Sequence, residues 1–478
     1  MKLKVLLLVP NFEWCDWDER SNWHFIPYNL CLIAATIKDI VTVNIIDANK
    51  NNYSENDLIE ELKNVKPDVV GITALMDQYG PAGHFAAKII KKYNKNIITI
   101  YGGVYATMNP EKVVEDKNID WCVIGEGEKI VKQLLLYFMG ESDVPKRGIA
   151  FEKDGKIHNS GHADFISDLN LIPFPAYDFI NYNSYSHYKG SRKSVDSPPL
   201  YPYARILTSR GCPYNCVFCQ VESISGKQFR ARSAENVLNE IKWLKEKYKI
   251  KSIIFDDDNL FIDRKRAVEI FQGMIDNKLD LPWLAIAVSA FKLDEELIKL
   301  MGKSGCIYIN IAIESGTERV LKKIIKKPIN LSSAKNIARI VKQNNIFIAA
   351  NFIVGFPGET WDEIRKTLQY AQEIDVDYVK IFTPIPLPKT RLWDLCEKSK
   401  SLKKGFNDNK AMWNSGQIET EEFTSRDLTI LRAYEWDRIN FLNNEKIEKI
   451  ALRMNISVNE INEMRKKTRF IASHFSEE

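Results

Sequence analysis

The chain has 478 residues, of which 45% are hydrophobic and 27% are charged. This composition excludes an intrinsically disordered chain, and the length is more than one compact core usually holds, so we expect two or three domains. The net charge of +4 is small for this size and gives no reason to expect nucleic acid or an anionic membrane as a partner.

Cysteine usage indicates a reducing compartment, and hydropathy gives no sign of a membrane span. Three of the eight cysteines lie within residues 212–219 and the others are scattered, which is typical of cytosolic proteins rather than of a disulfide framework. The apolar run Val5–Val9 resembles the start of a signal peptide but stops at Pro10 and is too short for one. No apolar run approaches the length of a membrane span. We therefore expect a cytoplasmic protein without a transmembrane segment.

Residues 1–140 alternate short apolar runs with helical patterns. The expected strands are Lys4–Val9, Val41–Ile46, Val69–Thr73, Asn96–Tyr101 and Asp120–Ile124, and the expected helices are Tyr28–Lys38, Ser54–Asn64 with a serine cap, and His84–Tyr93. Strand and helix in turn predict an α/β domain with a parallel, doubly wound, Rossmann-like sheet. Such sheets bind ligands at the carboxyl ends of their strands.

The third, fourth and fifth of these strands end in Thr73–Met76, Gly102–Tyr105 and Gly125–Glu128. Glycine at these positions lets a bulky ligand approach the backbone closely. Neither a GxGxxG motif nor a Walker loop is present, so the pattern does not favour a dinucleotide or ATP.

Residues 141–202 form a connector in our interpretation. Its first part, Gly148–Ile157, contains an Asp-Gly turn signal and predicts a hairpin. Its later part, Asp168–Asp178, is an extended segment with two prolines.

From residue 203 to residue 395 the alternation of strand and helix resumes. The expected strands are Arg205–Thr208, Ser252–Phe255, Leu284–Val288, Tyr308–Ile313, Phe347–Val354 and Tyr378–Phe382. Polar residues follow each strand, and six strand–helix units with such residues on one rim predict a partial (β/α)6 barrel. Residues 396–478 are charged and helical in pattern, with Ser425–Leu442 and Asn444–Met454 as expected helices.

The first barrel strand leads into Cys212, Cys216 and Cys219, at Cys-x3-Cys-x2-Cys spacing, with Phe218 just before the last cysteine. Three thiolates this close repel one another unless a metal neutralises them. An iron–sulfur cubane normally takes four thiolates, so a cubane on these three keeps one iron open. A structural zinc site, which usually has four ligands in paired groups, and three unliganded thiols are the alternatives, and no second ligand pair is present.

The cysteine spacing with its aromatic residue resembles the signature of the radical S-adenosylmethionine (SAM) superfamily. With the glycine-bearing strand ends of residues 1–140, the chain is similar to the cobalamin-dependent (B12-dependent) members, in particular to the class B methyltransferases. The resemblance implies a [4Fe–4S] cluster on Cys212, Cys216 and Cys219 whose open iron chelates SAM. It also implies that residues 1–140 are a cobalamin-binding domain and that residues 203–395 are the radical SAM barrel.

Several strand ends correspond to the family's SAM-binding motifs. Asp256–Asn259 stands where the family has Gly-Gly-Glu, Glu314–Gly316 resembles the ribose motif, and Ile353–Thr360 resembles the adenine-side motif. The residues implied to contact SAM are Phe218, Asp257, Asp258, Ser289, Glu314, Ser315, Ile353 and Gly355. Taken alone, the aspartate run reads as a solvated strand end and Gly355–Thr360 as a turn. After the sixth strand the family's Pro-Gly-Thr is replaced by Pro386–Thr390, so specificity is expected to differ there.

The residues implied to bind cobalamin are Thr73, Leu75, Met76, Gly102, Gly103, Gly125, Glu126 and Gly127. The Asp-x-His-x-x-Gly motif that supplies a cobalt-ligating histidine in other cobalamin proteins is absent, and His24 and His84 are the only imidazoles in this half. Each of them is more often a surface or core histidine than a ligand. By analogy, Leu75 or Met76 faces the lower side of cobalt, unless both are core residues. A domain that holds no cofactor is the other alternative.

The resemblance implies that the reduced cluster splits SAM to a 5′-deoxyadenosyl radical, which abstracts hydrogen from an unactivated position of the substrate. Methylcobalamin then donates a methyl group. A radical cyclisation, ring contraction or oxidation without methyl transfer is one alternative, and a non-catalytic cobalamin or redox sensor is another. The family implies a small-molecule or lipid-like substrate and a flavodoxin or ferredoxin as electron donor.

Overall fold

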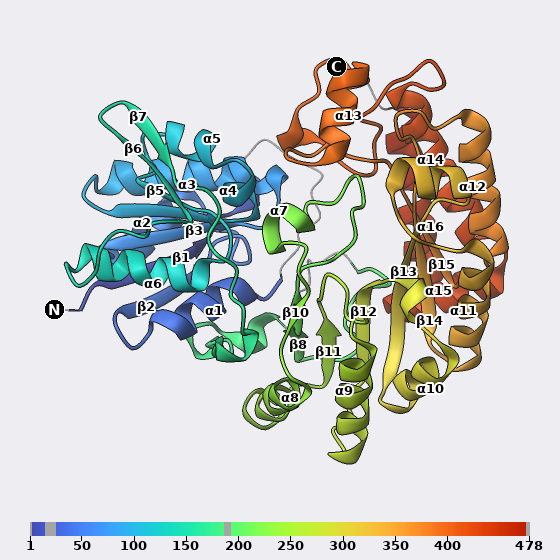
Figure 1. The fold of residues 1–478 in the computed structure, drawn as a ribbon, viewed down its shortest axis with the longest axis horizontal. Helices are drawn as coiled ribbons and strands as arrows, with labels where there is room; N and C mark the ends of the chain where they lie inside the picture. Colours follow the sequence, from blue (N-terminus) through green and yellow to red (C-terminus); the bar gives the residue numbers. More distant parts are fainter. Residues whose placement is uncertain (1, 15–24, 186–192, 475–478) are drawn as a thin grey trace. The chain divides into compact units, whose positions relative to one another are not determined.

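The computed structural model describes residues 2–14, 25–185 and 193–474, which divide into two compact units (Figure 1). The first unit is Met1–Arg192 with Ser223–Gly226, and the second is Lys193–Glu222 with Lys227–Glu478. None of the helices in the described parts of the chain is both long enough and apolar enough to cross a membrane.

The first unit is built on a seven-stranded sheet of order β2-β1-β3-β4-β5-β6-β7. Its strands are β1 (Lys4–Val9), β2 (Thr42–Asp47), β3 (Val69–Ala74), β4 (Ile98–Gly103), β5 (Trp121–Val123), β6 (Ile149–Lys153) and β7 (Lys156–Asn159). The five strands predicted in residues 1–140 are present and run parallel. β2 lies on one side of β1 and β3 on the other, so the order of the strands reverses between β1 and β3. Ligands of such sheets bind at this switch point. The predicted hairpin is also present, and it extends the same sheet antiparallel to β5.

Helices cover both faces of this sheet. They are α1 (Tyr28–Ile37), α2 (Glu55–Val65), α3 (Gly80–Tyr93), α4 (Val104–Met108), α5 (Pro110–Glu115) and α6 (Gly127–Phe138). Because side chains alternate along a strand, Leu6 and Leu8 of β1 join the core under α2 and α3, whereas Leu7 joins the core under α1 and α6. The predicted serine cap is confirmed, since Ser54 and Asp57 form a capping box.

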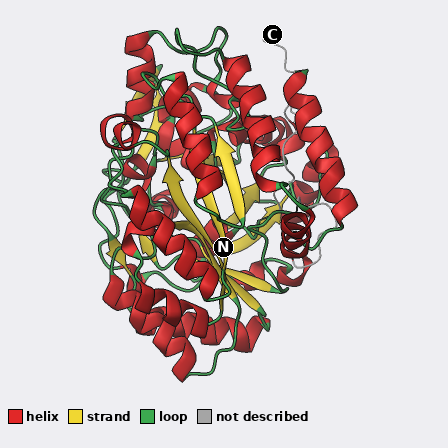
Figure 2. Ribbon diagram, turned by 90° about the vertical axis from the view of Figure 1, so that its right-hand side faces the viewer, coloured by secondary structure: helices red, strands yellow, loops and turns green. Residues whose placement is uncertain are grey.

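The second unit contains a parallel sheet of order β15-β14-β13-β12-β11-β8. Its strands are β8 (Tyr203–Ile206), β11 (Ser252–Phe255), β12 (Trp283–Val288), β13 (Cys306–Glu314), β14 (Phe347–Ile353) and β15 (Tyr378–Phe382). The helices that follow these strands are α8 (Ala234–Tyr248), α9 (Arg264–Asp276), α10 (Glu295–Lys303), α11 (Leu331–Gln343), α12 (Trp361–Glu373) and α13 (Arg391–Ser399) (Figure 1). Figure 2 distinguishes helices, in red, from strands, in yellow. The predicted six-unit partial barrel is therefore confirmed.

Local boundaries differ from the prediction at the first barrel strand. β8 ends at Ile206, and Ser209–Arg210 forms a separate short strand, β9, paired with β10 (Arg230–Ala231). The predicted strand Arg205–Thr208 therefore ends early, at Ile206. Beyond it, the backbone N–H of Thr208 and the hydroxyls of Thr208 and Ser209 donate to Asp257. The cysteine loop follows directly, and α7 (Val221–Ser225) comes after it.

The C-terminal helices close the free edge of the barrel sheet. They are α14 (Ser425–Asn440), α15 (Asn444–Met454) and α16 (Val458–Ser473). Asn440 accepts a hydrogen bond from Val379 N at 2.7 Å and donates to Val379 O at 2.8 Å, and Arg432 Nε donates to Ile381 O at 2.9 Å. An open strand edge would otherwise expose these backbone groups. The helical segment predicted from residue 396 therefore completes the sheet at β15.

Candidate active site

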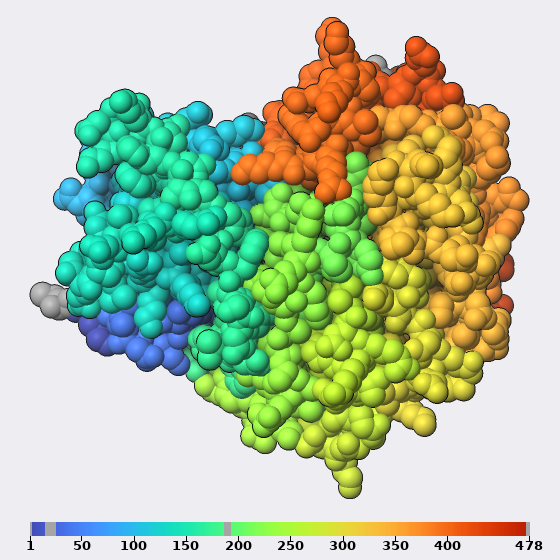
Figure 3. Space-filling model, viewed as in Figure 1, coloured from blue at the N-terminus to red at the C-terminus, as the bar shows by residue number. Residues whose placement is uncertain are grey.

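The cysteine loop is held by backbone hydrogen bonds from two neighbouring elements. Val217 N donates to Ile325 O at 3.0 Å, at the end of a short π-helix, η7 (Val320–Ile325), and Leu392 N of α13 donates to Val217 O at 2.9 Å. π-Helical turns occur frequently at functional sites. The space-filling view shows the surface of α13 (orange) beside that of the cysteine loop (green) (Figure 3). The loop is therefore fixed from both sides at Val217, one of the two residues between its second and third cysteines.

The three motif cysteines differ from the other described cysteines. Cys212, Cys216 and Cys219 are partly exposed, whereas Cys31, Cys122, Cys306 and Cys396 are buried. Burial raises the pKa of the Cys216 thiol to about 11 and that of Cys219 to about 12, and it also raises the pKa of Cys212. Thiols with a raised pKa stay protonated unless a bound metal supplies positive charge.

The donor set fits a cluster better than a single ion. Among the residues that the structure describes, no group of three or more His, Cys, Asp or Glu side chains is placed to hold one metal ion. In a cubane each thiolate binds a different iron, so three cysteines on one loop need not converge on one point. Three cysteines without a second ligand pair in the sequence are the donors that a [4Fe–4S] cluster with one open iron takes.

Asp257 anchors the strand that leads to the cysteine loop. Its carboxylate is buried and accepts hydrogen bonds from the hydroxyls of Thr208, at 2.7 Å, and of Ser209. Burial raises the pKa of Asp257, while these hydrogen bonds and the nearby Arg266 act in the opposite direction. The residue predicted to contact SAM thus faces β9 in this structure.

The neighbouring aspartates take different positions. Asp256 accepts from Arg205 Nε at 3.0 Å, and Asp258 accepts from the backbone N–H of Gly211 at 3.2 Å, one residue before Cys212. Burial raises the pKa of Asp258 to about 6, with the two preceding aspartates as further causes. Asp258 therefore lies at the cysteine loop, whereas Asp256 is paired across the sheet.

The ends of β11 and β12 are joined by a buried hydrogen bond. Asn259 Nδ2 donates to Ser289 Oγ at 2.8 Å, and both side chains are buried. A hydrogen bond from Asn259 also acts to lower the pKa of Cys212 against the effect of burial. The predicted site residue Ser289 is thus linked through Asn259 to the cysteine loop.

Glu314 ends β13 in an unusual conformation. Its φ of 75° lies in the left-handed region that non-glycine residues rarely adopt. Its carboxylate accepts from Lys327 Nζ at 2.7 Å in an ion pair of which both side chains are buried. The Lys327 charge also acts to lower the pKa of Cys216. The next residue, Ser315, is fully buried and hydrogen-bonded to Thr367 Oγ1 at 3.1 Å.

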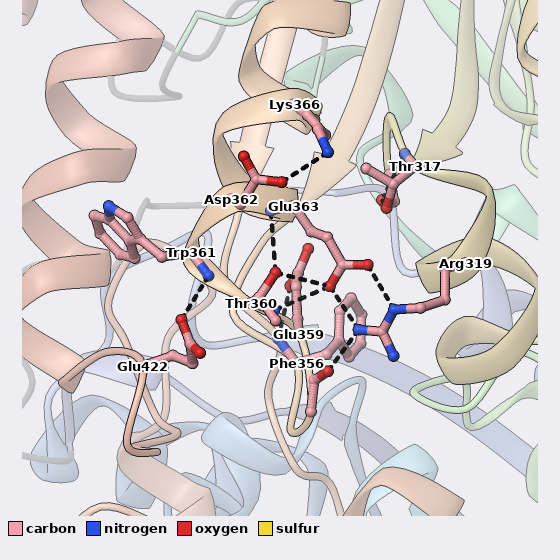
Figure 4. A network of polar contacts seen from close by, with 12 residues as sticks. Thr317, Arg319, Phe356, Glu359, Thr360, Trp361, Asp362, Glu363, Lys366 and Glu422 are labelled. Carbon is pink, nitrogen blue, oxygen red and sulfur yellow. Dashed lines mark hydrogen bonds and ion pairs between the residues drawn. The ribbon is translucent and has the colours of Figure 1, made fainter.

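The loop after β14 is organised by Glu359. One oxygen of this buried carboxylate accepts from the backbone N–H groups of Gly355, at 2.8 Å, and Phe356, at 3.0 Å (Figure 4). Burial raises the pKa of Glu359 to about 7, although these hydrogen bonds act to lower it. Phe356 lies 6.1 Å from Phe218, centroid to centroid, so the loop reaches the aromatic residue of the cysteine motif. Ile353, the predicted SAM contact at the end of β14, is buried.

The start of α12 carries a second network of this loop. Arg319 donates from Nε to Glu363 at 2.6 Å and from NH2 to Gly358 O at 2.7 Å, and Glu363 forms a capping box with Thr360 (Figure 4). The Arg319 guanidinium lowers the pKa of Glu363 to about 2. Arg319 therefore joins the segment after β13 to the loop after β14.

Sequence reasoning missed two residues that shape this rim. Lys327, the buried partner of Glu314, is one of four lysines within residues 322–327, and no spacing distinguishes it from the others. Leu428 of α14 lies so close to Gly355 that any Cβ at that glycine would collide with it. The positive φ of 100° at Gly355 could be predicted from the sequence only through the Gly-Phe-Pro-Gly turn pattern.

In the first unit, Thr107 joins the glycine-bearing ends of β4 and β5. Its hydroxyl donates to Gly103 O at 2.8 Å and accepts from Gly125 N at 2.9 Å. Gly103 and Gly125 have φ values of 95° and 94°, which favour glycine. A Cβ on Gly103 would lie 2.6 Å from Ala74 O.

The neighbouring predicted residues take mixed positions. Thr73 is buried and pairs with Gly102 across the sheet, where an added Cβ would meet no atom nearer than 3.7 Å. Glu126 is buried and accepts from Ile166 N at 2.7 Å, so it holds the connector. Gly127 begins α6.

Leu75 and Met76 differ from each other. Leu75 is 38% exposed, so it is not a core residue, whereas Met76 is partly buried and packs against the core. An exposed apolar side chain next to bare glycine backbone fits the approach of a large ring such as a corrin.

His84 does not offer a free nitrogen to a metal. Its Nδ1 lies 2.8 Å from Asp116 Oδ2 and its Nε2 lies 3.3 Å from Tyr105 Oη. His24 lies outside the described residues. The structure therefore places the one described imidazole among residues 1–140 in a structural role.

Comparisons with known proteins match both units. The family model of the radical SAM superfamily matches residues 206–371, and that of the B12 binding domain matches residues 22–135. An uncharacterized methyltransferase of Pyrococcus horikoshii is 32% identical over 371 residues, which cover 77% of this chain and 78% of the relative. Cytidylyl-2-hydroxyethylphosphonate methyltransferase of Streptomyces wedmorensis is 30% identical over 386 residues, which cover 74% of this chain and 70% of that relative.

A solved structure shows the same fold. The cobalamin-dependent SAM radical enzyme OxsB, with aqua-cobalamin and SAM bound, superposes with a TM-score of 0.71 at 17% identity, over 98% of this chain and 72% of that chain.

Proposed function

This chain belongs to the cobalamin-dependent radical SAM enzymes, and we propose that it methylates an unactivated centre of a small-molecule substrate. Its cofactors are a [4Fe–4S] cluster, SAM and cobalamin. When bound, the cluster with SAM supplies a 5′-deoxyadenosyl radical and cobalamin supplies the methyl group, while the protein provides binding and geometry.

We assign the chain's own residues as follows. Cys212, Cys216 and Cys219 hold the cluster, and Asp258, beside the cysteine loop, accepts the SAM amino group. Glu314, held in a buried ion pair with Lys327, accepts from the ribose hydroxyls. This assignment prefers Asp258 over Asp257, because the carboxylate of Asp257 is occupied by Thr208 and Ser209.

Further contacts follow at the same rim and in the first unit. The backbone of Gly355 and the ring of Phe218 bind the adenine side, with Ser289, Ser315 and Ile353 shaping the rim. In the first unit, the ends of β3, β4 and β5 receive cobalamin, with Leu75 facing the ring. The observation that carries the proposal is the set of contacts at this rim: Gly211 N donates to Asp258, Lys327 pairs with Glu314, and Phe218 of the cysteine loop lies beside Phe356, which follows Gly355.

The test is anaerobic reconstitution of the full chain with iron, sulfide and hydroxocobalamin, followed by removal of unbound cofactor. We expect about four irons and one corrinoid per chain. With SAM and a reductant, we expect 5′-deoxyadenosine and, with substrate, transfer of the label from methyl-labelled SAM. Cys216→Ala is expected to lose the iron, whereas Cys396→Ala, at a buried cysteine outside the motif, is the matched control.

The outcomes separate the alternatives. Iron without corrinoid would remove the methylcobalamin chemistry. 5′-Deoxyadenosine without label transfer would favour cyclisation, ring contraction or oxidation, and corrinoid binding without SAM cleavage would favour a sensor. A flavodoxin or ferredoxin is the proposed electron donor, and replacement of the chemical reductant by reduced flavodoxin tests this.

A further inference from the structure

The barrel sheet has one face against the helices and one face turned away from them, here called the inner face. Side chains alternate along a strand, so residues at every second position share a face. Ile309, Ile311 and Ile313 of β13 are fully buried on the helix side, as are Ile348 and Phe352 of β14. The positions between them carry the side chains of the inner face.

The inner face carries polar side chains among apolar ones such as Ala312 and Ala349, whereas the helix side is apolar. On β13 it carries Tyr308 and Asn310, on β14 Asn351, and on β15 Lys380. Asn351 lies opposite Lys380 in the register of β14 and β15. The side chains of Tyr308 and Lys380 both donate hydrogen bonds to Asp196. Asn351 and Lys380 keep partial exposure, which shows that this face is accessible.

The side-chain oxygens of two asparagines on this face have no hydrogen-bond partner among the described residues. Asn310 is only 2% exposed, and its Oδ1 is buried without a partner among the residues that the structure describes. The Oδ1 of Asn351, on the adjacent strand, is in the same condition in the described parts of the chain. Buried polar atoms are nearly always paired, so two neighbouring exceptions aimed at one face point to an absent ligand or water.

The charged groups of the inner face are already neutralised. Lys380 forms an ion pair with Asp196, and Arg205 forms one with Asp256. The cations are thus held by carboxylates, and the groups left with unused hydrogen-bonding capacity are neutral amides. An amide offers one acceptor oxygen and two donors, which match a neutral edge with both an N–H and a C=O.

We propose that the substrate inserts a neutral amide-type edge, as in a carboxamide, a lactam or a nucleobase, against the inner face, where Asn310 and Asn351 hydrogen-bond to it. The inference rests on the proposed function, since it names the substrate class of that radical enzyme. A purely aliphatic lipid chain would leave both carboxamides unpaired at this position. A phosphate or carboxylate would have to displace Asp196 or Asp256 from its cation.

The test uses 2-pyrrolidone as probe on the reconstituted full chain with its cluster oxidised, with and without SAM. Binding is measured by saturation-transfer NMR. Cyclopentanone, which has the same ring and carbonyl but no N–H, octanoate and inorganic phosphate are the comparison probes. The variants are Asn310→Leu and Asn351→Leu, and Asn336→Leu, at an exposed position of α11, is the matched control.

We expect 2-pyrrolidone to bind better than the three comparison probes and to bind roughly fivefold to tenfold more weakly in each inner-face variant, as for the loss of one hydrogen bond. Asn336→Leu should bind it as the unaltered chain does. Because Asn310 is buried, the partly exposed Asn351 supplies a second variant that keeps the fold if Asn310→Leu does not.

Other outcomes overturn the inference. Absence of 2-pyrrolidone binding, equal binding in both variants, or a preference for octanoate or phosphate would each reject a neutral amide edge. A matching loss of SAM affinity in both variants would assign the carboxamides to SAM instead. Failure of the proposed function is seen separately, as no 5′-deoxyadenosine or label transfer by the reduced enzyme, whatever the probe does.

Discussion

The two units prepare their candidate ligand sites in opposite ways. At the barrel rim, the predicted residues Asp258 and Glu314 are carboxylates held by a backbone N–H and by a buried lysine. At the strand ends of the first unit, the same role falls to Gly102 and Gly103, where side chains are missing, and to the exposed Leu75. SAM is a small charged ligand that charged groups orient, whereas a corrin ring needs room against the backbone.

This difference predicts how each unit is damaged. At the rim, the most damaging substitutions remove a charge or hydrogen bond and leave its partner buried and unpaired. In the first unit, they add atoms where the backbone must stay bare. The predictions below test this contrast, beginning with the largest effect.

Lys327→Met is expected to be the most damaging of these changes. It leaves Glu314 buried without its cation, which costs on the order of 3–5 kcal/mol of the free energy of unfolding for such pairs. Urea denaturation of the second unit measures this. The double variant Lys327→Met with Glu314→Gln should recover much of the stability without recovering SAM cleavage.

Lys323→Met, at an exposed lysine of the π-helix that precedes Lys327, is the control for Lys327 and should change stability by less than about 0.5 kcal/mol. If Lys327→Met were equally mild, the ion pair would not support the rim and the contrast between the units would weaken.

Gly103→Ala tests the first unit by adding a Cβ to its glycine backbone. At φ 95° and ψ −168°, Gly103 lies in a backbone region that essentially only glycine adopts, which costs an alanine on the order of 1–3 kcal/mol, and the collision of its Cβ with Ala74 O adds a packing penalty. Gly140→Ala, also at positive φ but with no atom within 4 Å of the added Cβ, isolates the backbone cost. We expect Gly103→Ala to lose corrinoid while it retains iron, and Gly140→Ala to retain both.

Retention of corrinoid by a folded Gly103→Ala variant would argue against close approach of a ring at β4. Loss of iron together with corrinoid would instead indicate general unfolding, which circular dichroism on the same sample distinguishes.

Glu359 predicts a dependence of stability on pH. Burial raises its pKa in the folded state to about 7, above the value of about 4.5 expected when unfolded. The stabilisation is therefore fully present below about pH 4.5 and is lost as the pH rises through about 7, by on the order of 2–3 kcal/mol. In Glu359→Gln, the amide cannot ionise, so the Glu359 part of the decline should disappear from urea denaturation curves recorded between pH 5 and pH 8, while the part due to Asp258, whose pKa is raised to about 6, should remain.

A matched change exists in the first unit. Burial raises the pKa of Asp47 to about 6, and its carboxylate accepts from Tyr185 Oη at 2.8 Å. Asp47→Asn should remove a smaller pH-dependent loss from the first unit and leave that of the second unchanged. If Glu359→Gln kept the full slope, another group of the second unit would be its source.

The sequence predicted most of the fold because buried strands leave apolar runs between glycines and polar turns. β1, β11 and β15 match the predicted ranges residue for residue. The start of α3 was placed four residues late, at His84 instead of Gly80, because Pro81 was not recognised as a first-turn proline.

Site detail was less accessible from the sequence, since it depends on partners far along the chain. Three consecutive aspartates look alike in the sequence, yet Asp257 faces β9 and Asp258 faces the cysteine loop. Leu428 reaches Gly355 from a helix more than seventy residues later, and no local pattern indicates this contact. The motifs identified the strand ends that form the candidate site, but not which side chain at each end remains available to contact a ligand.

Leu75→Gln is expected to have the smallest effect on stability and tests the first unit most sharply. The side chain is already 38% exposed, so the free energy of unfolding should change by less than about 0.5 kcal/mol. If Leu75 contacts a corrin ring, the loss of apolar burial should weaken corrinoid retention roughly fivefold. Leu171→Gln, at a leucine of the same unit that is 73% exposed, should leave corrinoid retention unchanged.

Corrinoid retained per chain after gel filtration, read from the visible spectrum, measures both leucine variants. Equal retention in Leu75→Gln and Leu171→Gln would mean that Leu75 lies away from the ring, and the bare glycines alone would define the site. A selective loss in Leu75→Gln would show that the first unit also uses a side chain, an apolar one. The contrast with the rim would then lie in the chemistry of the contact, because no charge is removed and no partner is left unpaired.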